Sequence, residues 1–331
     1  AKAFGMSESG IKHKNLALVG NDSGCLLTAC ANSFARNCAK AACRSCHMCA
    51  PWWNGSSTAS ACQDDTRLLV VLRGEPFRTS ATRATLGGDR KELVTANQKL
   101  LQSEAADADV SRLLAPSIVA MQAQLIDSLR DKILVEAEKL GYVTELVAVV
   151  HHRNPRVRQR YAKLLKARAC KAAAVVWAPR HVTQLTSTLA VLEAALMAAS
   201  SPDAWSALLL VRHDSLFTLP LPLPPPTQLG HAIHVPVVFR RWKGVNGNAH
   251  GVHDHVHLIP YCRLEDFLRW LARNAQYDSM HGLCLQEPKL SPVRSLLPLN
   301  EWWRFMVTTR DLTFNRTTGR WNITLLDPLL N

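Results

Sequence analysis

Short apolar runs alternate with amphipathic stretches between residues 67 and 214. The runs at 67–77, 144–150, 172–177 and 207–211 are rich in aliphatic residues, as is typical of strands buried on both faces. The stretches between them, at 117–140, from Asn154-Pro155 onward and at 183–199, carry apolar residues at helical spacing. This order predicts an α/β fold with a doubly wound, mostly parallel sheet.

The segments on either side of this alternation have a different character. Residues 219–226 read LPLPLPPP, which predicts a stiff, extended connector on the surface. Beyond it the pattern predicts strands at 232–239 and 256–259, a helix at 263–274 and a terminal hairpin within 313–324. Residues 1–66 show no sustained period. We therefore divide the chain into a cysteine-rich extension at 1–66 and an α/β domain at 67–331.

Most of the cysteines fall in the N-terminal extension, namely Cys25, Cys30, Cys38, Cys43, Cys46, Cys49 and Cys62. The CxxCxxC spacing of three of them is compatible with zinc or part of an iron–sulfur cluster, whereas the group as a whole is typical of a disulfide framework. Four Asn-X-Ser/Thr sequons, at Asn21, Asn54, Asn315 and Asn322, favour disulfides and glycosylation in the secretory pathway. We expect a disulfide-stapled module or arm.

The composition of the chain excludes some classes of protein. The 331 residues are 47% apolar and 20% charged, a globular balance that excludes disorder throughout the chain. No run of about 18 uncharged apolar residues occurs, so we expect no membrane-spanning helix. Residues 1–10 lack the apolar core of a signal peptide, so we expect any signal or anchor to lie outside this sequence.

One predicted helix is strongly basic. The formal net charge is +13, and residues 153–171 contain basic side chains but no acidic one. This pattern indicates either a solvated helix face or a surface for an acidic partner. Because no RRM-, KH- or zinc-finger-type motif accompanies it, we do not expect a nucleic-acid partner.

Polar residues follow the predicted strands at their carboxyl ends, where α/β sheets bind ligands. They are Arg73-Gly74-Glu75, His151-His152, Ala178-Pro179-Arg180 and Arg212-His213-Asp214. Gly74 would let a ligand approach the backbone, and Arg73 could pair with a phosphate. Asp214 could hold a divalent metal beside a diphosphate, or it could cap a turn.

A histidine-rich segment lies farther along the chain. If it is a strand, His253, His255 and His257 share one face, while Asp254 shares the other with apolar residues. Three imidazoles on one face could bind zinc, copper or iron. The alternative is that Asp254 points inward as an acid or base, with the histidine face partly solvated.

Three segments, taken in order, resemble a known family. Residues 70–78 read VVLRGEPFR, 208–217 read LLLVRHDSLF, and 239–260 read FRRWKGVNGNAHGVHDHVHLIP, followed by a helix and Met280-His281-Gly282-Leu283. These segments are similar to the VxLRGExFR, TRFDL, DxxHxxP and HG motifs of glycosyltransferase-like proteins from green algae and large viruses. The resemblance extends over about residues 67–290.

The resemblance implies a nucleotide-sugar-dependent transferase with a GT-A-like fold. It implies a nucleotide site at Arg73, Gly74 and Glu75. Asp214 would face a metal, Mn²⁺ or Mg²⁺, or the sugar diphosphate. Asp254 and His257 match the later motif, with Asp254 as the acceptor-side base of an inverting reaction, and His281 would close the site.

Two departures from the family pattern affect the predicted chemistry. His213 stands where the family has Phe, and the chain has no DxD motif. A metal-free enzyme would need Arg212 or Arg240 to stabilise the leaving diphosphate.

We therefore expect a glycosyltransferase of the Golgi lumen, the cell surface or the secreted fraction, acting from a nucleotide sugar onto a glycan or glycoprotein. The cysteine-rich extension could serve as a stalk or bind a protein partner. The first alternative is a non-catalytic structural or glycan-binding component of a surface assembly. The second is a basic organellar protein that binds RNA in a salt-sensitive manner.

Overall fold

The computed structural model describes residues 66–77, 110–111, 114–152, 154–169, 173–178, 184–199, 205–242, 249–252, 254–273, 293–298, 302–308, 312–315, 317–318 and 320–323. The cysteine-rich extension, with its seven cysteines, Asn21 and Asn54, lies outside the described residues. The same holds for Pro179, Arg180, His253 and His281. The predictions made for these positions stay predictions.

Seven strands form the central sheet in the order β10-β6-β9-β4-β1-β2-β3. The parallel half consists of β1 (Arg67–Gly74), β2 (Val143–Val150), β3 (Ala173–Trp177) and β4 (Ala207–Arg212). Strand β9 (Val256–Pro260) runs antiparallel to β4 and to β6 (Ile233–Val235), while β10 (Val293–Ser295) is parallel to β6. The predicted α/β class with a mostly parallel sheet is confirmed.

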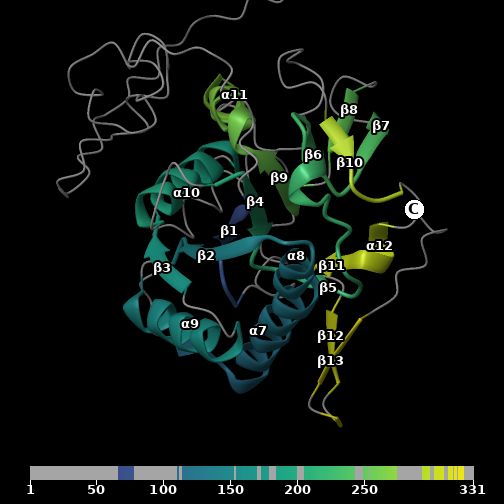
Figure 1. Ribbon diagram of the computed structural model, residues 1–331. Coiled ribbons are helices and arrows are strands. Elements are labelled where there is room, and N and C mark those ends of the chain that lie inside the picture. Colours follow the sequence, from purple (N-terminus) through teal and green to yellow (C-terminus); the bar gives the residue numbers. More distant parts are fainter. Residues whose placement is uncertain are drawn as a thin grey trace, which may run out of the picture.

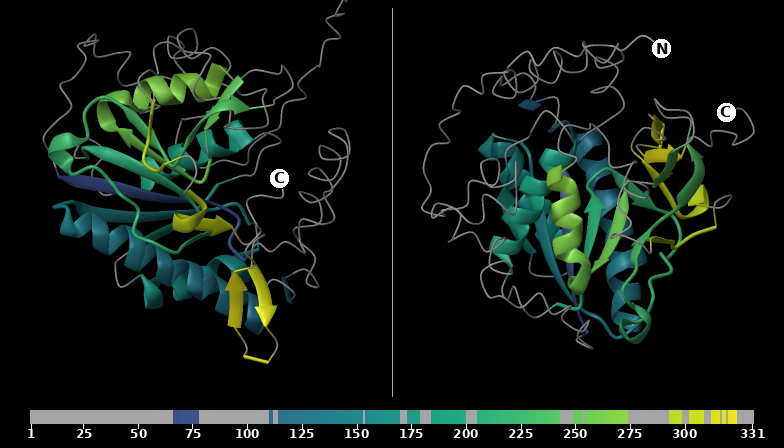
Figure 2. Two further views of the ribbon diagram at one scale, coloured as in Figure 1. Left: turned by 90° about the vertical axis from the view of Figure 1, so that its right-hand side faces the viewer. Right: turned by 90° about the horizontal axis from the view of Figure 1, so that it is seen from above.

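Helices cover both faces of this sheet (Figures 1 and 2). On one side, which we call the α10 face, lie α10 (Gln184–Ala198) and α11 (Tyr261–Arg273). On the other, the α7 face, lie α7 (Pro116–Leu129), α8 (Val135–Lys139) and α9 (Pro155–Arg168). Asn154 caps α9, since its side chain accepts a hydrogen bond from the Arg156 N–H.

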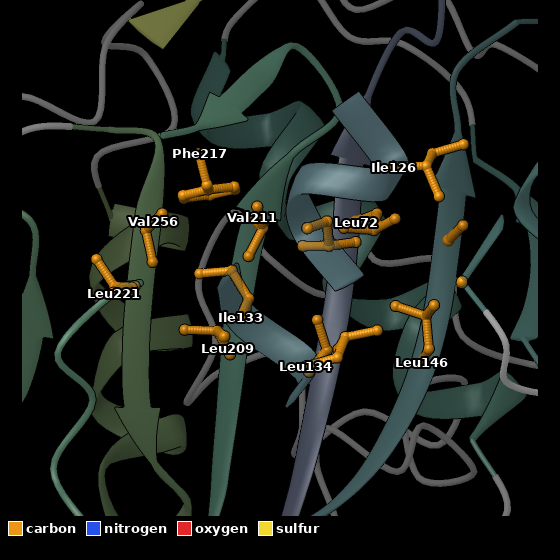
Figure 3. Packing of buried hydrophobic residues seen from close by; sticks show 14 of the residues in the cluster. Leu72, Ile126, Ile133, Leu134, Leu146, Leu209, Val211, Phe217, Leu221 and Val256 are labelled. Carbon is orange, nitrogen blue, oxygen red and sulfur yellow. The ribbon is translucent and has the colours of Figure 1, made fainter. Parts of the chain in front are cut away.

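Each central strand supplies side chains to both cores, because successive residues of a strand point to opposite faces. Leu69 and Val71 of β1 pack on the α10 face, and Leu68 and Val70 pack on the α7 face. Figure 3 shows part of the α7-face core, where Ile133 lies among buried residues of the sheet. Burial on both faces explains why the predicted strands read as continuous apolar runs.

The helix predicted at 117–140 exists but is interrupted by a π-turn, η4 (Arg130–Leu134). A wider turn shifts the phase of the apolar stripe. Leu140, the last residue of the predicted helix, is 36% exposed directly after α8. Within the π-turn, the Lys132 carbonyl accepts a hydrogen bond from the Leu221 N–H at 3.1 Å, which fastens the 219–226 connector to this helix.

The connector is extended, as predicted, but only half of it belongs to the surface. Leu221 and Leu223 are buried against the α7-face core, whereas Pro222 between them is exposed. The alternation of Leu and Pro therefore closes one edge of the core.

The region after the connector contains more strands than predicted. The segment predicted as one strand at 232–239 forms β6 and β7 (Val238–Trp242), with Pro236 between them, where no backbone N–H is available to a ladder. Strand β7 pairs with β8 (Ala249–Val252). Strand β11 (Met306–Thr308), which follows α12 (Trp302–Phe305), pairs with β5 (Ser215–Phe217), a short strand that precedes the connector.

The predicted terminal hairpin is confirmed as β12 (Leu312–Asn315) and β13 (Arg320–Ile323), in antiparallel register. Asn315 and Asn322, the two C-terminal sequon residues, both lie in this hairpin. No helix in the described part of the chain is both long and apolar enough to cross a membrane.

One acidic residue on α10 gives the fold a testable pH dependence. The Glu193 Oε1 atom is buried without a hydrogen-bond partner, and burial raises the pKa of this carboxyl from 4.5 to about 8. Between these two values the unfolded chain has released the proton that the folded chain still holds. The free energy of unfolding should therefore fall as the pH rises through this window.

We expect Glu193→Gln to match the wild type near pH 5 and to exceed its stability by roughly 1–3 kcal/mol near pH 8. Urea unfolding across this pH range measures the difference, and Glu138→Gln, at an exposed position, is the control. Parallel stability curves for the wild type and Glu193→Gln would contradict the expectation.

Candidate functional site

The candidate site lies where the carboxyl ends of β1 and β4 meet. The chain leaves β1 toward β2 on one side, whereas β4 pairs with the opposite side of β1. A point where consecutive connections diverge in this way is a topological switch point, and open α/β sheets bind ligands in the crevice there. Two of the predicted segments, Arg73-Gly74-Glu75 and Arg212-His213-Asp214, end at this point.

Two arginines stand side by side at this edge. In the parallel register of β1 and β4, Arg73 is the partner of Arg212. Arg73 follows Leu69 and Val71 at a period of two, so its side chain belongs to the α10 face, as does that of Arg212 after Leu210. Two like charges on neighbouring strands repel each other, and the arrangement therefore requires compensating acidic groups.

Asp214 and Asp254 provide this compensation through Arg212. The Nε and Nη2 groups of Arg212 donate to the two carboxylate oxygens of Asp214 at 2.8 and 2.6 Å, while Nη1 donates to Asp254 Oδ2 at 3.0 Å. Burial disfavours the charge on Arg212, but the two aspartates outweigh burial and raise its pKa. This guanidinium is therefore charged at every physiological pH.

Arg73 is compensated far less directly. Its Nη2 donates to the backbone oxygen of Asp254 at 2.6 Å and its Nη1 to Thr188 Oγ1 at 3.5 Å, while its buried Nε has no hydrogen-bond partner. Burial lowers the pKa of this guanidinium to about 10, so it is still protonated at neutral pH. Among the described contacts no carboxylate pairs with Arg73. It is therefore a buried cation whose Nε–H group can still donate a hydrogen bond.

Helix α10 supplies the second layer of contacts on this face. Gln184, at the start of the helix, donates from Nε2 to Asp254 Oδ2, and Thr188 lies one turn later beside Arg73. Arg73, Asp214 and Asp254 are each more than nine-tenths buried, whereas the Arg212 side chain keeps 14% of its surface exposed. The cluster therefore reaches solvent mainly at Arg212.

The opposite face of the same edge carries a neutral polar cluster. His213 lies between the Tyr161 hydroxyl, 2.7 Å from Nδ1, and the Val149 carbonyl, 3.0 Å from Nε2. Because a carbonyl can only accept, Nε2 carries the proton and Nδ1 accepts from Tyr161. Burial lowers the pKa of His213 to about 4, so the ring is neutral at physiological pH. Position 213 is thus occupied by a buried, hydrogen-bonded and neutral histidine.

Gln122 of α7 connects the segment after β1 to the segment after β4, on the α7 face of the sheet. Its Oε1 accepts the Phe77 N–H at 2.7 Å, and its Nε2 donates to the His213 carbonyl at 3.3 Å. Phe77 has a positive φ of 62°, a strained backbone conformation for a bulky residue. Gln122 therefore holds the chain after β1 at a fixed position relative to the end of β4.

The structure brings together only some of the predicted site residues. Arg73, Arg212, Asp214 and Asp254 form one cluster, and Gly74 beside it has a φ of 110°, which glycine adopts readily. His257 of β9 lies farther from the carboxyl end of β4 than this cluster does. It is the register partner of Leu210 on the α10 face, and its ring packs against Phe267. Glu75 directly follows β1, and Arg240 belongs to β7.

The predicted alternation through the histidine-rich segment is wrong. Residues 254–255 form a bend and β9 begins only at Val256, so no strand face relates Asp254 to His255 or His257. The expectation of partial solvation is wrong for these two described histidines, which are both buried. Asp254 does point inward, toward Arg212.

The donor set does not fit a divalent metal ion. Both oxygens of Asp214 and one of Asp254 accept hydrogen bonds from Arg212, whose positive charge already lies between the two carboxylates. In the described part of the chain, no group of three or more His, Cys, Asp or Glu side chains could hold a metal.

Sequence reasoning missed the residues that support the cluster, which are Gln122, Tyr161, Gln184 and Thr188. A signal existed for one of them. Gln122 lies four residues from both Ile118 and Ile126, inside the apolar stripe of a helix, where a polar side chain needs a buried partner.

Comparisons with known proteins add little. No protein-family model matches the chain, and no curated protein matches it. Among solved structures, Rv0371c from Mycobacterium tuberculosis H37Rv is similar, with 17% identity, a TM-score of 0.28, and coverage of 71% of this chain and 89% of that one. Nothing about activity follows from a likeness at this level.

We expect Gln122→Met to lower the free energy of unfolding by about 1–3 kcal/mol, because the buried Phe77 N–H and His213 carbonyl would lose their partner. Chemical denaturation measures the change. Gln124→Met, at an exposed position on the same helix, should have little effect. Equal stabilities of the two variants would contradict the role assigned to Gln122.

Proposed function

We propose that the chain is a nucleotide-sugar-dependent glycosyltransferase with a GT-A-like domain, whose donor diphosphate binds at the carboxyl ends of β1 and β4. The observation that carries the proposal is Arg73, a buried guanidinium at the switch point whose Nε has no partner and whose charge no carboxylate neutralises directly. Burying a charge without pairing it is costly, so such groups gather at functional sites. A diphosphate would supply the missing acceptors.

The backbone around Arg73 favours the same ligand. Strand order β3-β2-β1-β4 matches the parallel half-sheet of nucleotide-binding α/β folds, which hold their ligand at this edge. Gly74, with its positive φ, has no heavy atom within 4 Å of the position of a Cβ. A phosphate group could therefore approach the backbone closely there.

Asp254 is the base in the proposed reaction. Its salt bridge with Arg212 favours the ionised form, which can accept the proton of an acceptor hydroxyl. The hydroxyl oxygen then forms a bond to the anomeric carbon of the sugar as the bond from that carbon to the diphosphate breaks. The leaving diphosphate takes the electron pair, and Arg73 and Arg212 stabilise its charge. This course inverts the configuration of the sugar.

The cellular setting belongs to the proposal as well. The four sequons and the cysteine-rich extension favour a luminal or extracellular protein, in the Golgi, at the cell surface or secreted. The acceptor would then be a glycan or glycoprotein, and the extension at 1–66 could bind a protein partner. We keep Asn315 and Asn322 of the β12–β13 hairpin as predicted glycosylation sites.

A second candidate function is a non-catalytic glycan-binding or structural component. The observation that favours it is that Arg212 pairs with both oxygens of Asp214 and with Asp254, since such an ion network can serve to hold the ends of β4 and β9 together without binding a ligand. The two candidates differ in whether the cluster binds a nucleotide.

We expect Arg73→Gln to weaken binding of nucleoside diphosphates by about 10- to 100-fold, the value of one or two charge-assisted hydrogen bonds. Calorimetric titration with UDP, GDP, ADP and CDP measures this. Arg156→Gln, on the exposed face of α9, is the charge-matched control. If Arg73→Gln binds as tightly as the control, the proposed site is wrong.

Asp254→Asn separates catalysis from binding. We expect the variant to bind the nucleoside diphosphate but to hydrolyse the matching nucleotide sugar about 10²- to 10⁴-fold more slowly, because it lacks a general base. Release of nucleoside diphosphate, with water as acceptor, provides the assay. Absence of hydrolysis in the wild type together with absence of nucleotide binding would instead favour the non-catalytic candidate.

A further inference from the structure

We infer that Arg212 takes the place of a divalent cation, so that this site binds a nucleoside diphosphate without metal. The inference rests on the proposed function and specifies how the same site holds its ligand. It follows from the contacts of Arg212 with the two carboxylates, which are independent of the argument made for Arg73.

A metal shared by Asp214 and Asp254 would lie between them, about 2.0–2.6 Å from an oxygen of each. The Arg212 guanidinium occupies this position, with donor–acceptor distances of 2.8 and 2.6 Å to Asp214 and 3.0 Å to Asp254. Gln184 donates to the same Asp254 oxygen. A cation would have to displace these donors and would then lie against a guanidinium of the same sign.

Arg212 is not easily displaced. It is the last residue of β4, and its backbone N–H donates to the His255 carbonyl at 3.1 Å. The two aspartates stabilise the charge of its guanidinium. Moving it would break its salt bridges with two buried carboxylates, which is strongly unfavourable. The protein therefore carries its own cation at the point where a metal-dependent site would recruit one.

In this geometry the two arginines have different roles. Arg212 neutralises Asp214 and Asp254, so these carboxylates repel an incoming diphosphate less strongly. Arg73, its neighbour in register, has the spare Nε–H and faces no carboxylate of its own. Guanidinium groups bind phosphate oxygens with planar, directional hydrogen bonds, which suits Arg73 to the diphosphate.

The test is calorimetric titration of the wild-type chain with UDP, GDP, ADP and CDP. One series contains about 1 mM EDTA. The other contains about 1 mM Mn²⁺, a concentration that would fill an ordinary divalent-cation site. We expect one of them to bind with the same affinity, within about threefold, under both conditions. Binding that appears only with Mn²⁺ would overturn the inference and leave the proposed function standing. Binding under neither condition would overturn the proposed function.

A variant gives the inference a second, ligand-free readout. Arg212→Gln removes the internal cation and leaves Asp214 and Asp254 as oxygen ligands, so Mn²⁺ alone should raise the melting temperature of the variant but not of the wild type. Arg130→Gln, which breaks ion pairs with Asp127 and Asp131 elsewhere on the chain, is the control. If Mn²⁺ stabilises the wild type and Arg212→Gln equally, Arg212 does not occupy a cation position. If Arg212→Gln does not fold, the wild-type titration decides alone.

Discussion

Two neighbouring arginines at the end of a buried sheet impose the main constraint on this structure. Arg73 and Arg212 are register partners on β1 and β4, where the parallel ladder leaves no room to separate them. Their repulsion is offset by Asp214, two residues after the end of β4, and by Asp254, two residues before the start of β9. Removing one partner from such a buried network typically costs about 3–5 kcal/mol. The cluster therefore couples the parallel half of the sheet to its antiparallel half.

The surroundings of the cluster hold it in place from both faces. On the α10 face, Gln184 and Thr188 contact Asp254 and Arg73. On the α7 face, Gln122 ties the loop after β1 to His213, and Tyr161 fixes the His213 ring as a neutral tautomer. The charged groups thus lie on one side and the neutral groups on the other. A ligand at the switch point would meet a site whose geometry is set before binding.

The sequence predicted the parallel core well, because strands buried on both faces are simple apolar runs and amphipathic helices have a clear period. It also placed Arg73, Arg212 and Asp214 at the carboxyl ends of the strands, where the structure has them close together, while their roles in binding stay predictions. It could not predict the bend at 254–255, because alternation along the histidine-rich segment looks the same for a strand. The polar residues within helices were missed for a related reason. Gln184 and Thr188 join the cluster only through contacts with residues far away in the sequence.

The proposed function depends on a diphosphate that binds between β1 and β4 through arginine side chains. A crystal structure of the chain with the nucleoside diphosphate that binds best, grown with EDTA, tests it most directly. We expect phosphate oxygens within hydrogen-bond distance of Arg73 Nε, with Arg212 still paired to Asp214. A nucleotide bound at another edge of the sheet, or an Arg73 that makes no contact with it, would show that the diphosphate does not bind in this way.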